Sequence, residues 1–346
     1  MSRPIRDVFQ TLPPNARILL VRLRSMGDCL LLTSPLRALK QEFPGFKVSV
    51  LVDPGFSACF DFSPDVDEIL VTSNEKYQTI GRLLIRRFHV IVNLHGGPTS
   101  LSYSCAAWGR RIGVEGYQYD RLYSGLIPRP APNLHTVEAS MELFRWLGLR
   151  AEIPPPLHYA PHPEEAQWVR ETLRNRPYVV IHPATRMETK QWSAGGFASV
   201  GTLLAQAGWR TVLTSGPGEE SVVGQTARDL PDSVILFGLT IPKLAELIRG
   251  ARLYVGNDSG PMHLAAAVGT PTLAVWGSSD SRRWRPWGVA HRVVQNPFDC
   301  NPCPGYRCDV AETPLCIESV TTRQVKDAVQ SLLQETGRHT PAVATQ

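Results

Sequence analysis

A lone carboxylate after the first apolar run is the residue in this chain best suited to acid–base chemistry. The stretch RSMGDCLLLTSP, residues 24–35, carries Gly27 and Asp28 and no second acid. A helix N-cap would explain an aspartate here, because Asp commonly caps helices. However, Ser34 and Pro35 themselves form a good helix start, which makes Asp28 less needed as a cap. Two interpretations stay open: a cap, or a general base at the rim of a ligand site.

Two loops further along the chain could bind phosphate. The first, IHPATRMETKQWS at 181–193, follows an apolar run and provides Thr185, Arg186 and Lys190 as hydroxyl and cationic donors. The second, GNDSGPMHLAAAVG at 256–269, combines glycines, which let a ligand approach the backbone, with the free N–H groups of a helix start. A solvated loop is the alternative for the first, and a well-capped buried helix for the second.

The second of these loops has several polar residues close together. Its open N–H groups near Ser259 and Gly260 could form an anion nest. In the alternative, Asp258 or Ser259 caps the helix and His263 is a hydrogen-bonded neighbour. An acidic pair, Glu219-Glu220, could bind ribose hydroxyls or simply favour a helix dipole. The sequence has no GxGxxG after the first strand and no GxxxxGK[ST] motif, which counts against a dinucleotide dehydrogenase or a P-loop NTPase.

Four of the seven cysteines follow the pattern C-x2-C-x4-C-x7-C. They are Cys300, Cys303, Cys308 and Cys316. Four thiolates in one loop could bind a structural zinc ion tetrahedrally. The spacing is not that of a standard zinc finger, and a reducing compartment equally favours packed, reduced thiols. Both interpretations stay open.

Short apolar strands that alternate with helices must position these loops. Strands are predicted at Arg17–Leu23, Lys47–Val52, Glu68–Val71, His89–Leu94, Arg110–Val114, Tyr178–His182, Arg210–Thr214, Ser233–Phe237, Leu253–Val255 and Thr272–Trp276. Helices are predicted at Leu36–Phe43, Tyr77–Arg87, Phe197–Ala207, Ser221–Leu230, Pro242–Arg249, Met262–Val268 and Thr322–Leu333. This alternation is typical of parallel sheets with helices on both faces, and ligands then bind beyond the carboxyl ends of the strands.

A proline-rich segment marks the predicted domain boundary. Residues 151–163, AEIPPPLHYAPHP, contain five prolines and suit a stiff linker. We therefore predict α/β domains at 1–155 and 156–336, followed by a flexible tail at 337–346. Whether the final helix packs back on the first domain stays open.

Composition and charge narrow the class of protein. The 346 residues are 43% hydrophobic and 19% charged, which suits a soluble globular protein. No stretch approaches the ~18 uninterrupted apolar residues of a membrane-spanning helix, and the first residues lack the core of a signal peptide. The net charge of +5 favours anionic partners, and no basic run with interleaved aromatic residues points to nucleic acid. We expect a cytoplasmic protein that does not bind nucleic acid.

Taken together, these motifs resemble the ADP-heptose:lipopolysaccharide heptosyltransferase family, which are inverting glycosyltransferases of GT-B architecture. The resemblance runs from about Arg17 to Leu333, and it is most specific in RILLVRLRSMGDCLLLTSPLRALKQEFP and GNDSGPMHLAAAVGTPTLAVWG. WRPW at 284–287 and the cysteine-bearing tail look most like the heptosyltransferase III subgroup. The resemblance implies two Rossmann-like, doubly wound parallel-sheet domains that face a central cleft. The first would bind the acceptor and the second the nucleotide sugar.

The resemblance also implies roles by position. Asp28 matches the family's general base, and Lys190 matches the lysine held to the donor phosphates. Donor contacts are implied for Thr185, Glu219, Glu220, Leu239, Asp258, Ser259, Gly260 and His263. The loop at 182–192 is one residue longer than in the best-known members, and Ala184 stands where a second threonine can occur. The match at Thr185 therefore depends on the alignment.

The implied reaction moves a heptose from ADP-heptose to a hydroxyl of the lipopolysaccharide inner core, with no cofactor required. Asp28 would take the proton of the attacking hydroxyl, while Lys190 would stabilise the departing diphosphate without a metal. The acceptor would be anionic and membrane-anchored, which implies peripheral contact with the cytoplasmic face of the inner membrane. Three arginines of the first domain are candidates for binding it: Arg110, Arg111 and Arg121. The alternatives are a same-fold enzyme with another nucleotide sugar or glycan, and a non-catalytic scaffold that binds sugar nucleotides.

Overall fold

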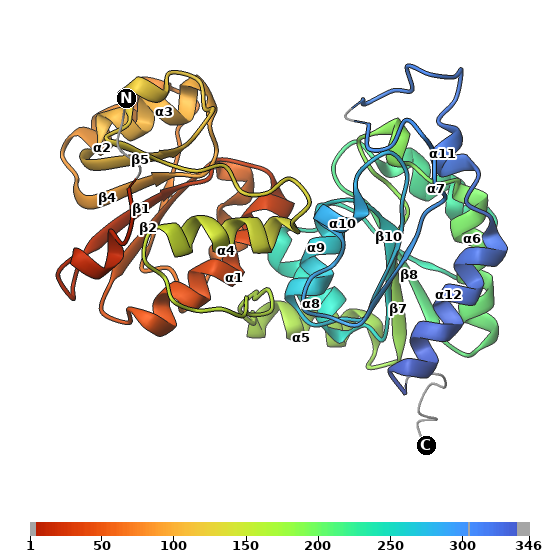
Figure 1. Ribbon diagram of the computed structural model, residues 1–346. Helices are drawn as coiled ribbons and strands as arrows, with labels where there is room; N and C mark the ends of the chain where they lie inside the picture. The colour runs from red at the N-terminus through yellow and green to blue at the C-terminus, as the bar shows by residue number, and fades with distance from the viewer. Residues whose placement is uncertain (1–4, 304, 338–346) are drawn as a thin grey trace. The chain divides into compact units, whose positions relative to one another are not determined.

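The computed structural model describes residues 5–303 and 305–337, which fall into two compact units (Figure 1). The first unit ends at Ala160 and the second begins at Pro161. The proline-rich segment 151–163 crosses this division, and it has no helix or strand until α5 (Pro163–Leu173) begins at its last residue. Proline at the first helical position suits this start, because its missing N–H would have no intrahelical partner there. The predicted tail lies outside the described residues from position 338 onward.

The described part of the first unit contains one six-stranded parallel sheet in the order β3-β2-β1-β4-β5-β6. Its strands are β1 (Arg17–Val21), β2 (Lys47–Val52), β3 (Glu68–Val71), β4 (Arg87–Asn93), β5 (Trp108–Val114) and β6 (Gly125–Ile127). Its α-helices are α1 (Met26–Glu42), α2 (Lys76–Leu84), α3 (Gly97–Ala106) and α4 (Thr136–Trp146). Most of the strands are nearly continuous apolar runs, as expected for a parallel sheet covered on both faces.

The described part of the second unit repeats this arrangement in the order β12-β11-β10-β7-β8-β9. Its strands are β7 (Tyr178–His182), β8 (Arg210–Thr214), β9 (Val234–Leu236), β10 (Tyr254–Asn257), β11 (Thr272–Val275) and β12 (His291–Val294). After α5 its α-helices are α6 (Ala194–Gln206), α7 (Glu220–Arg228), α8 (Ile241–Gly250), α9 (Gly260–Ala267), α10 (Ser281–Trp284), α11 (Leu315–Glu318) and α12 (Thr322–Glu335).

Both sheets have the strand order of a doubly wound fold, which confirms the predicted fold class. The order reverses between β1 and β4 in the first sheet and between β7 and β10 in the second. Ligands of such sheets bind beyond the carboxyl ends of the strands at this switch point. A ligand site is therefore expected in the loops that follow these strands.

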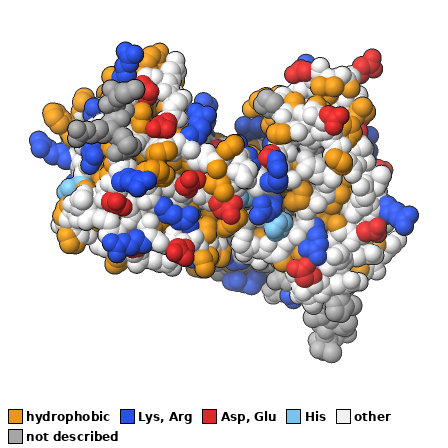
Figure 2. Space-filling view, viewed as in Figure 1, with side chains coloured by type: hydrophobic (Ala, Val, Ile, Leu, Met, Phe, Trp, Pro, Cys, Tyr) orange, Lys and Arg blue, Asp and Glu red, His pale blue; other side chains and the backbone are white. Residues whose placement is uncertain are grey.

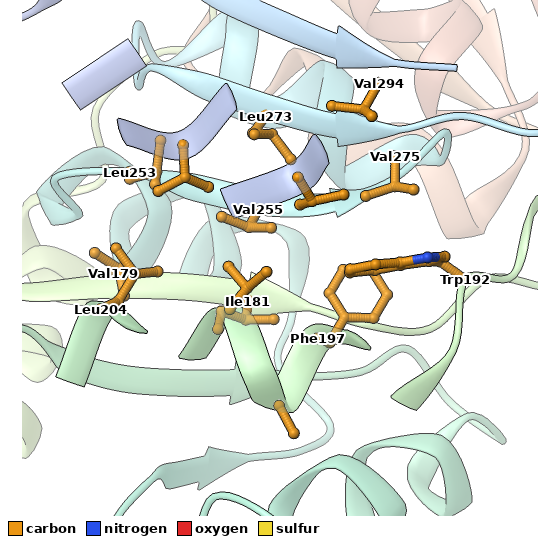
Figure 3. Close-up of a cluster of buried hydrophobic side chains, with 14 of the residues drawn as sticks. Val179, Ile181, Trp192, Phe197, Leu204, Leu253, Val255, Leu273, Val275 and Val294 are labelled. Carbon is orange, nitrogen blue, oxygen red and sulfur yellow. The ribbon is translucent and has the colours of Figure 1, made fainter. Parts of the chain in front are cut away.

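The core of the second unit lies between its sheet and the helices α6 and α12. Figure 3 shows Ile181 beside Phe197 and Val179 beside Leu204. The Trp192 and Phe197 rings meet edge to face, with centroids 4.9 Å apart, and the indole nitrogen of Trp192 donates to a backbone carbonyl at 2.8 Å. This packing fixes the end of the loop at 181–193.

Helix α12 packs against α6, β11 and β12. A capping box of Thr321 and Gln324 starts it, and its apolar face buries Val325, Val329 and Leu332 in the core of the second unit. Burying each such side chain contributes about 1.5–3 kcal/mol. By its packing, α12 belongs to the second unit.

One sequence interpretation is wrong at the start of α1. The helix begins at Met26, and Pro35 lies inside it rather than at its first turn. Ser25 and Asp28 form a capping box that starts the helix earlier than predicted. Burial of the apolar face of α1 outweighs the hydrogen bond that Pro35 cannot make. The argument that Asp28 is not needed as a capping residue therefore fails.

Charge is mixed on the surface. On the face in Figure 2, Lys and Arg side chains are interspersed with Asp and Glu rather than gathered in one field. Among the described residues, no helix is long and apolar enough to cross a membrane.

Candidate functional site

Asp28 lies in the first turn of α1, just beyond β1 at the switch point of the first sheet. One carboxylate oxygen accepts hydrogen bonds from the backbone N–H and the hydroxyl of Ser25, both at 3.2 Å. The other pairs with the guanidinium of Arg22, which also donates to the carbonyl of Leu94 after β4. The Asp28 side chain is still 22% exposed. The carboxylate is therefore both a helix-capping group and a group that a ligand can reach.

The surroundings of Asp28 are cationic and aromatic. Burial, together with Arg22 and Arg24, lowers the pKa of His95, so its imidazole is neutral at pH 7. The Tyr117 ring lies against the backbone of Gly96, where an added Cβ would be 3.1 Å from it. His95 and Tyr117 follow β4 and β5, and the sequence analysis missed them. The position of His95 just after the apolar end of β4 was the signal that could have found it.

In the second unit, Lys190 and Asp258 meet, although their motifs are far apart in sequence. The ammonium of Lys190 is 2.5 Å from a carboxylate oxygen of Asp258, and the Ser279 hydroxyl donates to the same oxygen. The Asp258 side chain is only 5% exposed and that of Lys190 17%. The pair places the cationic side chain of Lys190 just after β7. The ammonium can supply charge-assisted hydrogen bonds to an anion.

Two amide side chains hold the loop that carries Lys190. Gln191 accepts from the Thr185 backbone N–H at 2.9 Å and donates to the Pro183 carbonyl at 2.6 Å. Asn257 donates to the same carbonyl at 2.9 Å and accepts from the Trp192 N–H at 3.1 Å. Neither amide was predicted from the sequence. Their bonds fix the backbone at Thr185, whose side chain is half-buried, while Arg186 is exposed.

Two hydroxyl hydrogen bonds also hold the loop that carries Lys190. The Ser278 hydroxyl donates to the Thr189 hydroxyl at 2.9 Å, and the Thr189 hydroxyl donates to the Gly305 carbonyl at 2.7 Å. Gly277, the residue before Ser278, packs so tightly against this loop that an added Cβ would lie 2.1 Å from the Thr189 carbonyl oxygen. The 3₁₀ helix Glu188–Lys190 is therefore tightly packed against Gly277.

The start of α9 completes the group around Asp258. Ser259 is its N-cap residue and Gly260 its first residue, directly after β10 and Asp258. Backbone N–H groups in a first helical turn lack intrahelical partners and point outward, so they can bind an anion. His263 is buried in the same helix, with its ring edge-on to Trp284 at 6.5 Å between centroids.

The predicted acidic pair lies after β8 on the other side of the switch point. Glu219 accepts from the backbone N–H of Gly216 at 2.9 Å, and Glu220 from that of Gly218 at 3.2 Å. The imidazole of His182 is 3.8 Å from the Glu219 carboxylate and 3.0 Å from the Thr214 hydroxyl. Burial lowers the pKa of His182 to about 4, so the ring is neutral near pH 7 and its contact with Glu219 is not an ion pair.

Leu239 is half-buried and follows β9, just before the N-cap of α8. The predicted donor residues therefore follow β7, β8, β9 and β10, and the structure brings them to one edge of the second sheet. This is the edge at which a doubly wound sheet binds nucleotides.

The structure does not bring the predicted acceptor arginines to the edge that carries Asp28. Arg110 and Arg111 pair with Val90 and Ile91 in the middle of the sheet, and adjacent strand residues point to opposite faces. The Arg111 guanidinium donates to the Leu122 carbonyl at 3.1 Å. Arg121 is exposed in the 3₁₀ helix Asp120–Leu122. Arg22 and Arg24 follow β1 at the carboxyl edge.

The four cysteines of the tail do not form a metal site. Within residues 5–303 and 305–337, no group of three or more His, Cys, Asp or Glu side chains is placed to hold a metal ion. The Cys303 sulfur accepts from the Gly305 N–H and the Cys308 sulfur from the Ala311 N–H, both at 3.4 Å. Cys316 is buried. The side-chain placement gives the zinc interpretation no support.

Two doubly wound units, each with ligand-type residues at the carboxyl edge of its sheet, define a GT-B glycosyltransferase architecture. The sequence profile of glycosyltransferase family 9 (heptosyltransferase) matches residues 101–313, and the chain belongs to this family. It is therefore a glycosyltransferase, as the resemblance implied.

Curated relatives agree with this assignment. The chain is 27% identical over 294 residues to lipopolysaccharide heptosyltransferase 3 of Escherichia coli, which covers 77% of this chain and 84% of the relative. It is 24% identical to lipopolysaccharide heptosyltransferase 1 of Pseudomonas aeruginosa, over 92% of this chain and 98% of the relative.

Solved structures share the fold. A glycosyl transferase family 9 protein from Veillonella parvula superposes with a TM-score of 0.83 at 19% identity, over 94% of this chain and 99% of that one. The ADP-heptose lps heptosyltransferase II of E. coli superposes with a TM-score of 0.76 at 19% identity, over 93% and 99% of the chains.

Proposed function

We propose that this enzyme transfers a heptose from ADP-heptose to a hydroxyl of the lipopolysaccharide inner core. The observation that carries the proposal is the family match over residues 101–313. Curated relatives of the chain are named lipopolysaccharide heptosyltransferases, and solved structures of E. coli heptosyltransferase WaaC hold ADP and ADP-2-deoxy-2-fluoro heptose. A lipid-anchored acceptor would bring the enzyme to the cytoplasmic face of the inner membrane.

The second unit would bind the donor. Lys190 and the backbone N–H groups at the start of α9 are placed to compensate the negative charge of a diphosphate. Glu219 is held after β8, where acids of doubly wound folds bind ribose hydroxyls. Leu239, Thr185 and His263 would contact the remainder of the ADP-sugar. Charge develops on the departing diphosphate, so cations and amides fixed beforehand lower the barrier without a metal.

The first unit would supply the base. Asp28 would take the proton of the acceptor hydroxyl as that oxygen attacks the anomeric carbon opposite ADP, which inverts the anomeric centre. The Arg22 guanidinium and Ser25 fix the orientation of the carboxylate. The proposal requires Asp28 and the Lys190–Asp258 pair to act on the same pair of substrates.

Replacing Asp28 tests the base. We expect Asp28→Asn to lower kcat by about 10²-fold or more, because one general base contributes about 10²–10⁴-fold, while the affinity for ADP stays unchanged. Asp53 is the matched control, since it also lies beyond the carboxyl end of a strand of the first sheet, where it accepts from the Thr72 hydroxyl at 2.7 Å. Initial rates and ADP titrations would be compared for Asp28→Asn and Asp53→Asn. Near-normal turnover by Asp28→Asn would exclude the base assignment.

A donor screen tests the sugar nucleotide. ADP-heptose should raise the melting temperature more than UDP- or GDP-sugars, and ADP release should depend on an added lipopolysaccharide acceptor. Preference for another nucleotide would leave the family and the fold intact but contradict the proposed donor. Binding of ADP-heptose without acceptor-dependent ADP release would instead indicate a non-catalytic scaffold.

A further inference from the structure

A pocket of about 460 Å³ lies in the second unit between α5, α8 and the start of β7. Tyr178, the first residue of β7, lines it, as does Arg252, which precedes β10. Lys190 and Asp258 instead follow the carboxyl ends of these two strands. The pocket is therefore at the opposite edge of the sheet from the candidate donor residues, and the proposed function does not use it.

Four arginines from four segments line this pocket, which we call the arginine pocket: Arg170, Arg176, Arg249 and Arg252. Arg170 is in the last turn of α5 and Arg249 in the last turn of α8, and these two helices pack together. Arg176 and Arg252 precede the paired strands β7 and β10, and the Arg252 N–H donates to the Tyr178 carbonyl at 2.9 Å. Strand pairing and helix packing thus bring four cations to one cavity.

The residues that line the pocket carry more positive than negative charge. Glu246 is the one acid among the lining residues, and it is 4% exposed. It accepts from the Arg249 guanidinium at 3.1 Å and from the His162 N–H at 3.0 Å. One buried carboxylate therefore faces four arginines, so the pocket carries excess positive charge.

Helix capping does not explain why Arg176 is part of this lining. Arg210, outside the pocket, already donates to the Leu173 carbonyl at the end of α5, at 3.1 Å. Arg170 and Arg176 are exposed, and their side chains form no hydrogen bond or ion pair within the described ranges 5–303 and 305–337. Arg176 also lies outside any helix, so a helix dipole does not account for its position.

Part of the pocket's lining is apolar, and we call this part the floor. Ala166, Val169, Leu173 and Pro177 line it, and the Tyr178 hydroxyl is already bonded to the Leu247 carbonyl at 2.7 Å. A cavity of this volume falls in the range that holds small ligands. Arginines next to an apolar surface suit a ligand that has a phosphate at one end and carbon groups at the other.

We propose that the arginine pocket binds a phosphate group attached to a less polar moiety, as a second anion site of this chain. The guanidinium groups hold the phosphate, and the floor between α5 and the start of β7 covers the attached carbon atoms. A soluble phosphate compound and a phospholipid headgroup share this chemistry.

The test uses the full chain and separates the two sources. One arm measures the rise in melting temperature with inorganic phosphate at low salt. The other measures binding to vesicles of phosphatidylcholine with phosphatidylglycerol. We expect the double variant R176Q/R252Q to bind at least about tenfold more weakly than the wild type in one or both arms, because each arginine near an anionic surface strengthens binding several-fold. A response to phosphate alone assigns a soluble compound, and a response to vesicles assigns a headgroup.

Matched controls keep the result interpretable. R228Q/R323Q also removes two exposed arginines of the second unit, but none from the pocket, and should bind as the wild type does. Lys190→Met removes the candidate donor cation and should leave binding to the pocket in place. The proposal is overturned if R176Q/R252Q equals R228Q/R323Q in both arms, or if Lys190→Met abolishes the binding.

Discussion

At the scale of residues, Asp28 combines two roles that the sequence analysis treated as alternatives. Its carboxylate closes the capping box with Ser25, and it also pairs with Arg22. Both partners lie between the end of β1 and the first turn of α1, so the side chain is fixed without being covered. A carboxylate with a fixed orientation and an open face is what a general base needs.

His182 allows a prediction about pH. Its pKa is about 4 in the folded chain, below the ordinary value of about 6.5, because burial disfavours the charged ring. The unfolded chain therefore binds more protons, so this contribution to stability is complete above about pH 6.5 and is lost as the pH falls towards 4. Between pH 7 and pH 5 the loss should be about 2 kcal/mol.

Urea unfolding of the wild type and of His182→Gln checks this contribution. The variant cannot titrate at this position, so its free energy of unfolding should fall less between pH 7 and pH 5 than that of the wild type. Equal slopes for the two proteins would show that the buried ring is not the titrating group.

Residue types and spacing were sufficient to pick out the charged residues of the second unit but not their supports. Lys190 and Asp258 come from two recognisable loops, and the parallel order of β7 and β10 makes them meet. Gln191 and Asn257 carry no such signal, because an amide that bonds to loop carbonyls looks like any surface amide. Arg110 and Arg111 lie away from the edge that carries Asp28, and charge alone does not say how far along a strand a residue lies.

At the scale of elements, a small residue determines where the Lys190 loop can lie. Gly277 follows Trp276 at the end of β11, and the Thr189 backbone occupies the space that a side chain would need. We expect Gly277→Ala to displace the 3₁₀ helix Glu188–Lys190, to weaken ADP binding about tenfold, and to destabilise the fold by about 1–3 kcal/mol. Calorimetric titration and thermal melting measure these effects.

Gly195→Ala is the matched control for this prediction. Gly195 lies in the first turn of α6, and no atom is within 4 Å of an added Cβ. Alanine there should leave ADP affinity unchanged and stabilise the helix by up to about 1 kcal/mol. Normal ADP binding by Gly277→Ala would mean that the loop can shift without consequence.

The strands were easier to predict than the helix starts. Buried parallel strands are continuous apolar runs, and Lys47–Val52, Glu68–Val71, Tyr178–His182 and Arg210–Thr214 have the predicted bounds. β6 was missed because it has only 3 residues, and β12 because only its second half is apolar. The start of α1 was misplaced because Pro35 resembles a first-turn proline, although burial of the helix keeps it in the interior.

At the scale of the whole molecule, each unit has a hydrophobic cluster drawn from its own residues, which supports a prediction about fragments. The cluster that packs α6 and α12 against the second sheet draws only on residues from Val179 to Leu333. We therefore expect a fragment of residues 156–346 to fold alone and to bind ADP within about threefold of the full chain, because the proposed ADP contacts all lie within it. Circular dichroism and calorimetric titration with ADP measure both properties.

A shorter fragment that ends at 320 is the control. It lacks α12, whose apolar side chains fill the core beside β11 and β12, and should not fold cooperatively. An unfolded 156–346 fragment, or loss of ADP binding by a folded one, would contradict the predicted division of the chain at 155 and 156.

The place of α12 in the chain has a consequence for biosynthesis. The first unit is complete once Ala160 has left the ribosome, so it can fold while translation continues. The second sheet must wait for Val325, Val329 and Leu332, which are synthesised almost last. During that interval its strands have an uncovered apolar face, and we expect nascent chains stalled near residue 320 to be the species that chaperones bind most strongly.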